Sequence, residues 1–121
     1  MLEIINKKHG KSIVILTGNT STAINLSHLS TNTAIENVTA ASIARVFASG
    51  TALWKVFRGD DATGNSILEL AQNANWPLID YDIAISTNAT SNIYLTNSGT
   101  AGTIILVLSK EATYTPALTD F

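Results

Sequence analysis

Short apolar runs separated by clusters of Gly, Asn, Ser and Thr recur along the chain, and this pattern constrains the fold more than any other feature. In "PLIDYDIAIS", alternate positions share one face and hold Ile79, Tyr81, Ile83 and Ile85, which is typical of a strand with one buried face. The runs are too short for independently stable helices, so an all-β chain is predicted. About eight strands are expected, near residues 12–17, 22–29, 42–49, 52–58, 66–71, 78–86, 91–97 and 102–109.

Two of these runs are apolar on both faces. "IVIL" at 13–16 and "IILVL" at 104–108 have no polar residue at either set of alternate positions. A strand of this kind is expected where protein covers both of its faces. These two strands are therefore predicted to be central in a sheet, or to have one face at an interface.

Two segments leave helix and strand open. In "TNTAIENVTAASIARVF" the alanines favour helix, but Thr39, Val46 and Phe47 favour a loop that leads into a strand. In "SILELAQNA" the apolar spacing resembles a helix, yet the run is short, so a strand followed by a loop is expected. Pro77 cannot donate to a sheet ladder and is expected at the start of a strand.

The expected architecture is a two-sheet antiparallel β-sandwich, either a jelly roll or a related Greek key, because so many short amphipathic strands must stack to bury their apolar faces. Gly-containing links at 48–53 and 96–103 each predict a hairpin or a corner. A chain of 121 residues fits a single domain. The predicted division is an N-terminal arm at 1–11, a sandwich at 12–110 and a C-terminal arm at 111–121.

Composition argues against several classes of partner. Only 13% of residues are charged and the formal net charge is -2, so the chain has no broad basic field for nucleic acid or anionic lipid. The longest apolar run, 104–108, is far short of the ~20 residues of a membrane helix. With no cysteine and two separate histidines, neither disulfides nor a zinc site is expected. Because the N-terminus "MLEIINKKHGK" lacks a signal-peptide core, synthesis without export is expected.

Candidate catalytic residues are few. His9 and His28 lie in no recognisable motif, and they are expected to be ordinary surface histidines. Asp80 and Asp82 share one face of a predicted strand, whereas glycosidase acids lie on opposite sides of the scissile bond. The two aspartates are therefore expected to form a solvated row that discourages edge association, or to pair with Arg45 and Lys55 across a sheet. A non-enzymatic protein is predicted.

The tripeptide Arg58-Gly59-Asp60, inside "FRGDDATGNS", could mark a receptor-binding tip, but such a short match is unspecific. We expect Arg58 to end a strand and Asp60 to serve a turn. Asp60, Asp61 and Asn65 could also offer oxygens to calcium, yet the loop lacks the ligand pattern of an EF-hand. No metal or cofactor is expected.

Aromatic side chains are the main candidates for a binding surface. Trp54 and Trp76 could fill the core, stack on sugar rings or anchor a protein interface. In "ALWKVFRG" both faces of the predicted strand carry bulky apolar groups, which suggests that another subunit covers one of them. The residues predicted at an interface are Trp54, Phe57, Tyr114, Leu118 and Phe121.

The short strands, the Thr/Asn/Ser/Gly-rich loops, the absence of cysteine and stretches such as "IYLTNSGTAGTIILVLSKEATYTP" resemble small β-sandwich structural proteins of tailed bacteriophage virions, closest to capsid cement or decoration proteins. The resemblance concerns the general composition and strand pattern of residues 12–110. It assigns a function to no individual residue.

The resemblance implies a protein made in the host cytoplasm and located on the capsid exterior of the virion. Its expected partners are the major capsid protein, across whose junctions it would bind to stabilise the expanded head, and itself, as a dimer or trimer. The alternative is a β-sandwich carbohydrate- or receptor-binding module of a phage tail or fibre. That alternative requires an exposed Trp54 or Trp76.

Overall fold

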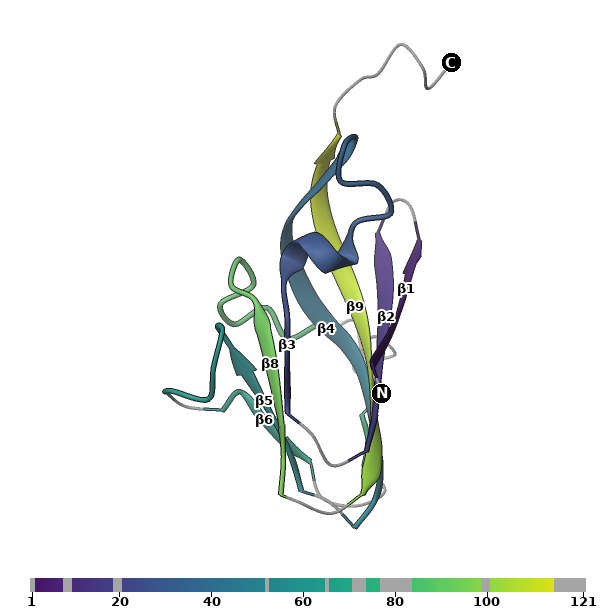
Figure 1. Ribbon diagram of the computed structural model, residues 1–121. Coiled ribbons are helices and arrows are strands. Elements are labelled where there is room, and N and C mark those ends of the chain that lie inside the picture. Colours follow the sequence, from purple (N-terminus) through teal and green to yellow (C-terminus); the bar gives the residue numbers. More distant parts are fainter. Residues whose placement is uncertain are drawn as a thin grey trace.

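The computed structural model describes residues 2–7, 10–18, 21–51, 53–64, 66–70, 74–76, 84–98 and 101–114. In this part of the chain, two antiparallel sheets stack on each other (Figure 1). The five-stranded sheet contains, in spatial order, β1 (Leu2–Lys7), β2 (Lys11–Gly18), β9 (Gly102–Tyr114), β4 (Glu36–Gly50) and β7 (Asn75–Trp76). The four-stranded sheet contains β3 (Thr22–Ile24), β8 (Ile93–Asn97), β5 (Trp54–Arg58) and β6 (Leu68–Leu70). The predicted β-sandwich is confirmed.

The connections are those of a jelly roll. From β2 to β9 the chain crosses to the other sheet at every connection except β5 to β6. The links after β4 and after β8 therefore form corners between the two sheets, which decides between the hairpin and the corner that the sequence left open. The described residues contain one 3-10 helix, η1 (Leu26–Leu29), and none of their helices is long and apolar enough to span a membrane.

The core lies between the sheets and is almost entirely aliphatic. Trp54 on β5 is its largest member and is 0% exposed. Strand β9 is the middle strand of its sheet, and Ile104, Leu106 and Leu108 point into this core. The central position predicted for 104–108 is confirmed. The other buried members include Val14, Leu16, Ile24, Leu29, Val38, Ile43, Val46, Val56, Leu70, Ile93 and Leu95.

Three boundaries differ from the sequence prediction. The expected strand at 22–29 ends at Ile24, because η1 turns the chain so that Leu29 can enter the core. β4 starts at Glu36 and β9 continues to Tyr114, because the two strands pair along their whole length and stabilise each other. The pairing includes irregularities between Val38 and Ala40 and between Ile43 and Arg45, and such bulges let long strands bend.

The predicted N-terminal arm is wrong for residues 2–7, which form the edge strand β1. Leu2 and Ile4 pair with Leu16 and Val14, so they share the core side of the sheet with them. Most of the predicted strand at 78–86, with Pro77 before it, lies outside the described residues. Its residue Ile85 forms an antiparallel bridge with Ile43. The predicted C-terminal arm at 111–121 is likewise wrong for residues 111–114, which belong to β9, and its remainder lies outside the described residues.

Gly50 makes the corner between β4 and β5 possible. Its φ is +94°, and a Cβ at this position would lie 2.7 Å from both the Ala101 carbonyl oxygen and the Gly102 Cα. The obstacle is backbone, which cannot rotate away as a flexible side chain can. Only glycine therefore fits at position 50, where the end of β4 lies beside the start of β9.

We expect Gly50→Ala to destabilise the fold by about 2–4 kcal/mol, because it combines left-handed backbone strain with a backbone clash. Gly64→Ala is the matched control, since Gly64 also has a positive φ but nothing within 4 Å of a Cβ. Its expected cost is about 1 kcal/mol. Urea unfolding of both variants measures the difference, and equal losses would contradict the role given to the close approach.

Candidate functional site

The outward side of the five-stranded sheet carries a continuous set of apolar side chains. Directly paired residues in an antiparallel ladder point to the same face, so the register places Ile5, Ile13 and Val107 in one row. Ile15, Ile105 and Phe47 form the next row. We call these six residues the outer apolar face. Ile5 is 40% exposed and the other five are partly buried, so the set is accessible at the surface.

Polar residues surround this face. Glu3 pairs with Ile15 at the β1 end of one row, and Arg45 pairs with Val107 at the β4 end of the other, so the two charges occupy opposite corners. Along the β2–β9 ladder, the next pair on this side is Lys11 with Ser109 in one direction. In the other direction it is Thr17 with Thr103. An apolar centre with a polar rim is the usual anatomy of a protein interface.

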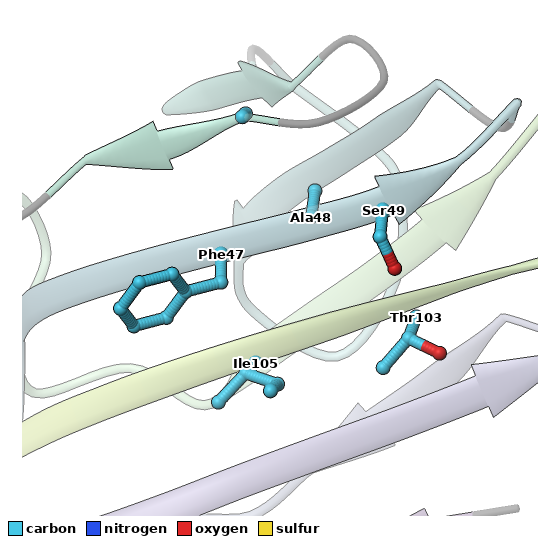
Figure 2. A pocket seen from close by; sticks show the side chains of 6 residues that line it. Phe47, Ala48, Ser49, Thr103 and Ile105 are labelled. Carbon is cyan, nitrogen blue, oxygen red and sulfur yellow. The ribbon is translucent and has the colours of Figure 1, made fainter.

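A shallow hollow of about 320 Å³ opens at one end of the face, lined by Phe47, Ala48, Ser49, Ala74, Thr103 and Ile105. Figure 2 shows Phe47 and Ile105 on neighbouring strands pointing to the same side, while Ala48 points to the opposite side. The hollow is at the lower limit of ligand-pocket size, and its labelled polar groups are two hydroxyls. It offers shape and apolar contact but no acid or base.

The described titratable group with the most perturbed environment is Glu36, at the far end of β4. Its side chain and that of Lys110 are both 0% exposed, and their Oε2 and Nζ atoms are 3.2 Å apart. Lys110 Nζ also donates to the Leu29 carbonyl at 2.6 Å. Glu36 accepts from the Thr31 backbone N–H at 2.6 Å and from the Tyr114 hydroxyl at 2.9 Å.

These contacts keep the carboxylate ionised. Burial alone would raise the pKa of Glu36, but hydrogen bonds from the Thr31 backbone, the Tyr114 hydroxyl, the Thr31 hydroxyl and Lys110 together lower it from 4.5 to about 2. Each carboxylate oxygen already accepts bonds inside a site closed to solvent. The group is thus unsuited to proton transfer with a substrate, and the cluster joins the ends of β4 and β9 to the η1 segment.

The tripeptide Arg58-Gly59-Asp60 is held within the fold. β5 ends at Arg58 as predicted, and this side chain donates to the carbonyl oxygens of Ala41 at 2.7 Å and Ala89 at 2.8 Å. Burial lowers the pKa of Arg58. Asp60 accepts from the Asn92 amide at 2.7 Å. Because Arg58 points inward and Asp60 outward, the tripeptide serves as a structural turn in this conformation.

The remaining polar candidates in the described part of the chain, Asp61 and His28, make local hydrogen bonds. Asp61 accepts from the hydroxyl and backbone N–H of Thr63, and these bonds lower its pKa, as in an Asp that stabilises a turn. The His28 Nδ1 accepts from the Asn25 N–H at 3.2 Å. Within the described residues, no three His, Cys, Asp or Glu side chains cluster as metal ligands would. His9, Asn65, Asp80 and Asp82 lie outside the described residues.

The interface residues predicted from sequence have separate positions. Trp54 is in the core at 0% exposure, so its assignment to an interface is wrong for this fold. Phe57 is 7% exposed although it faces away from the core, which means that its own chain covers it and no second subunit is needed. Tyr114 is 36% exposed while its hydroxyl bonds Glu36, so its interface role stays a prediction. Leu118 and Phe121 lie outside the described residues.

The outer apolar face was indicated only in part by the sequence. The two-sided apolar runs at 13–16 and 104–108 suggested an interface. The contributions of Ile5 and Phe47 depend on pairing with strands far away in the sequence. Comparison of the chain with protein-family models, curated proteins and solved structures finds no match.

We expect Glu36→Gln to destabilise the protein by about 3–5 kcal/mol, because it leaves the Lys110 ammonium buried without its counter-charge. Glu69→Gln is the control, since Glu69 forms an exposed 4.0 Å pair with Lys55 and its loss should cost less than about 1 kcal/mol. The double variant Glu36→Leu/Lys110→Met should lose less free energy of unfolding than the two single variants lose together. Equal melting of Glu36→Gln and Glu69→Gln would contradict this assignment.

Stability should also fall in acid through Glu36. Its pKa is depressed in the folded state, so its contribution is fully present above pH 4.5 and is lost as pH falls toward about 2. A shift of this size corresponds to roughly 3 kcal/mol. Urea unfolding at several pH values should show the gap between the wild type and Glu36→Gln closing across this window. A gap that stays constant would exclude the mechanism.

Proposed function

We propose that the chain is a non-enzymatic structural protein, a capsid cement protein that binds across junctions between major capsid protein subunits on the outside of an expanded phage head. The observation that carries the proposal is the outer apolar face, an uncharged area with a polar rim on the outward side of the five-stranded sheet. Such a surface suits packing against another polypeptide. The short strands and the Thr/Asn/Ser/Gly-rich loops of the sequence also resemble those of capsid cement proteins.

The physical properties of the chain fit this role. A protein that binds an assembled lattice in preference to loosened subunits stabilises the lattice by mass action. Repetition over many sites, and attachment to more than one subunit at a time, multiply the effect. With 13% charged residues and a net charge of -2, the surface can enter contacts while desolvating few charges.

The alternative, a carbohydrate- or receptor-binding module, finds less support in the positions of the aromatic residues. Trp54 is buried, whereas Trp76 is 40% exposed at the edge strand β7. Trp76 pairs with Val46 and Asn75 pairs with Phe47, so the indole and the Phe47 ring lie on opposite faces of the sheet. Sugar stacking would use aromatic rings on one accessible surface. These rings do not form such a platform.

The proposal predicts saturable binding of the purified chain to expanded heads that lack it, measured by co-sedimentation, together with a higher temperature of head disruption. Unexpanded heads are the comparison, because a cement protein prefers the assembled, mature lattice. A folded wild-type chain that fails to sediment with heads of either form would refute the proposal.

A further inference from the structure

The outer apolar face has the arrangement needed to recognise itself. Its two rows place aliphatic side chains on β1, β2 and β9 and the Phe47 ring on β4, with one charge at each of two opposite corners. In a face-to-face contact the two-fold axis lies in the plane between the copies, so an axis at a right angle to the line from Glu3 to Arg45 makes each of these two corners meet the other. A face whose opposite corners have opposite charges is complementary to its own rotated copy.

We propose that this face packs against the same face of a second copy of the chain, with Glu3 of each copy opposite Arg45 of the other. The assignment rests on the proposed structural role and gives this face to a second copy of the chain, so the resulting dimer would contact the head through its other surfaces. The apolar rows meet in the centre of the contact, and the two ion pairs lie at its ends. Sheets stacked in an aligned way cross at about 30°, so the two-fold axis is inclined to the strands and exchanges the charged corners.

The charged corners can make these contacts. Glu3 is exposed on the edge strand β1. Arg45 is partly buried and has an interaction within its own chain, and its five N–H donors allow a further acceptor. Like charges would instead meet if the partner were rotated so that the same corners coincided. The charges therefore favour one orientation of the second copy. They contribute more to the specificity of this orientation than to the affinity of the contact.

The size of the face predicts the strength of the contact. With its polar rim, the face covers four strands about 4.8 Å apart, with six residues on β1 and about seven on each of the others at about 3.4 Å per residue, which gives a footprint of roughly 20 by 23 Å, or nearly 500 Å² per copy. The two copies together would cover roughly 1,000 Å², which is the lower limit for a specific interface. We therefore expect a dimer that dissociates on dilution. The capsid lattice would hold such a dimer together by presenting neighbouring sites.

Sedimentation of the free protein over a range of concentrations tests the inference, with circular dichroism to verify folding. The wild type should change from monomer to dimer as concentration rises. Val107→Glu, at the centre of the face, should give a monomer, whereas Thr96→Glu on the outward side of the four-stranded sheet should not change the equilibrium. Glu3→Arg should raise the dimer dissociation constant about tenfold or more, because the pair occurs twice in each dimer.

The charge-swapped variant Glu3→Arg/Arg45→Glu should recover dimerisation. A folded wild type that remains a monomer at all concentrations, a trimer, or a double variant as weak as Glu3→Arg would each overturn the inference. Head co-sedimentation of the wild type, compared with its oligomeric state in solution, separates this inference from the proposed function. A dimer that does not bind heads refutes only the function, and a monomeric wild type that binds heads refutes only the self-contact.

Discussion

The ladder between β4 and β9 is the constraint on which the rest of the sandwich depends. It extends from the pair Glu36–Tyr114 to the pair Gly50–Gly102, and it joins segments more than 50 residues apart. β2 pairs with the free side of β9 and β7 with the free side of β4, so the five-stranded sheet has no continuity without this ladder. Its inward side chains supply much of the core, and its outward side chains supply half of the outer apolar face.

Each end of the ladder is secured by a different kind of interaction. At one end, Gly50 lets β4 approach the Ala101–Gly102 backbone at the start of β9 closely, where each chain segment crosses to the other sheet. At the other end, a desolvated ion pair connects β4, β9 and the Leu29 carbonyl beside η1. Replacing such a pair by apolar groups is often tolerated, whereas removing one partner is not. The pair therefore specifies the relative position of three segments more than it adds net stability.

Much of the fold could be predicted from residue pattern alone, because the continuous apolar runs at 104–108 and 13–16 are a local property of the sequence. Strand β1 was missed since Glu3 and Asn6 interrupt its apolar residues, and only pairing with β2 shows which side each residue occupies. The burial of Trp54 could not be predicted, because a tryptophan suits a core and a binding surface equally well. The Glu36–Lys110 pair joins residues 74 positions apart, so no local signal indicates it.

The place of β9 in the five-stranded sheet also affects how the protein can be made. It is the latest of the described strands to be synthesised, yet it lies between β2 and β4, which have no direct contact with each other in the ladder. Until the ribosome has released residues 102–114, both neighbours expose unpaired strand edges and apolar side chains, a state prone to aggregation. Nascent chains stalled before this point would need a chaperone to shield them, and those completed would assemble the sheet in one late step.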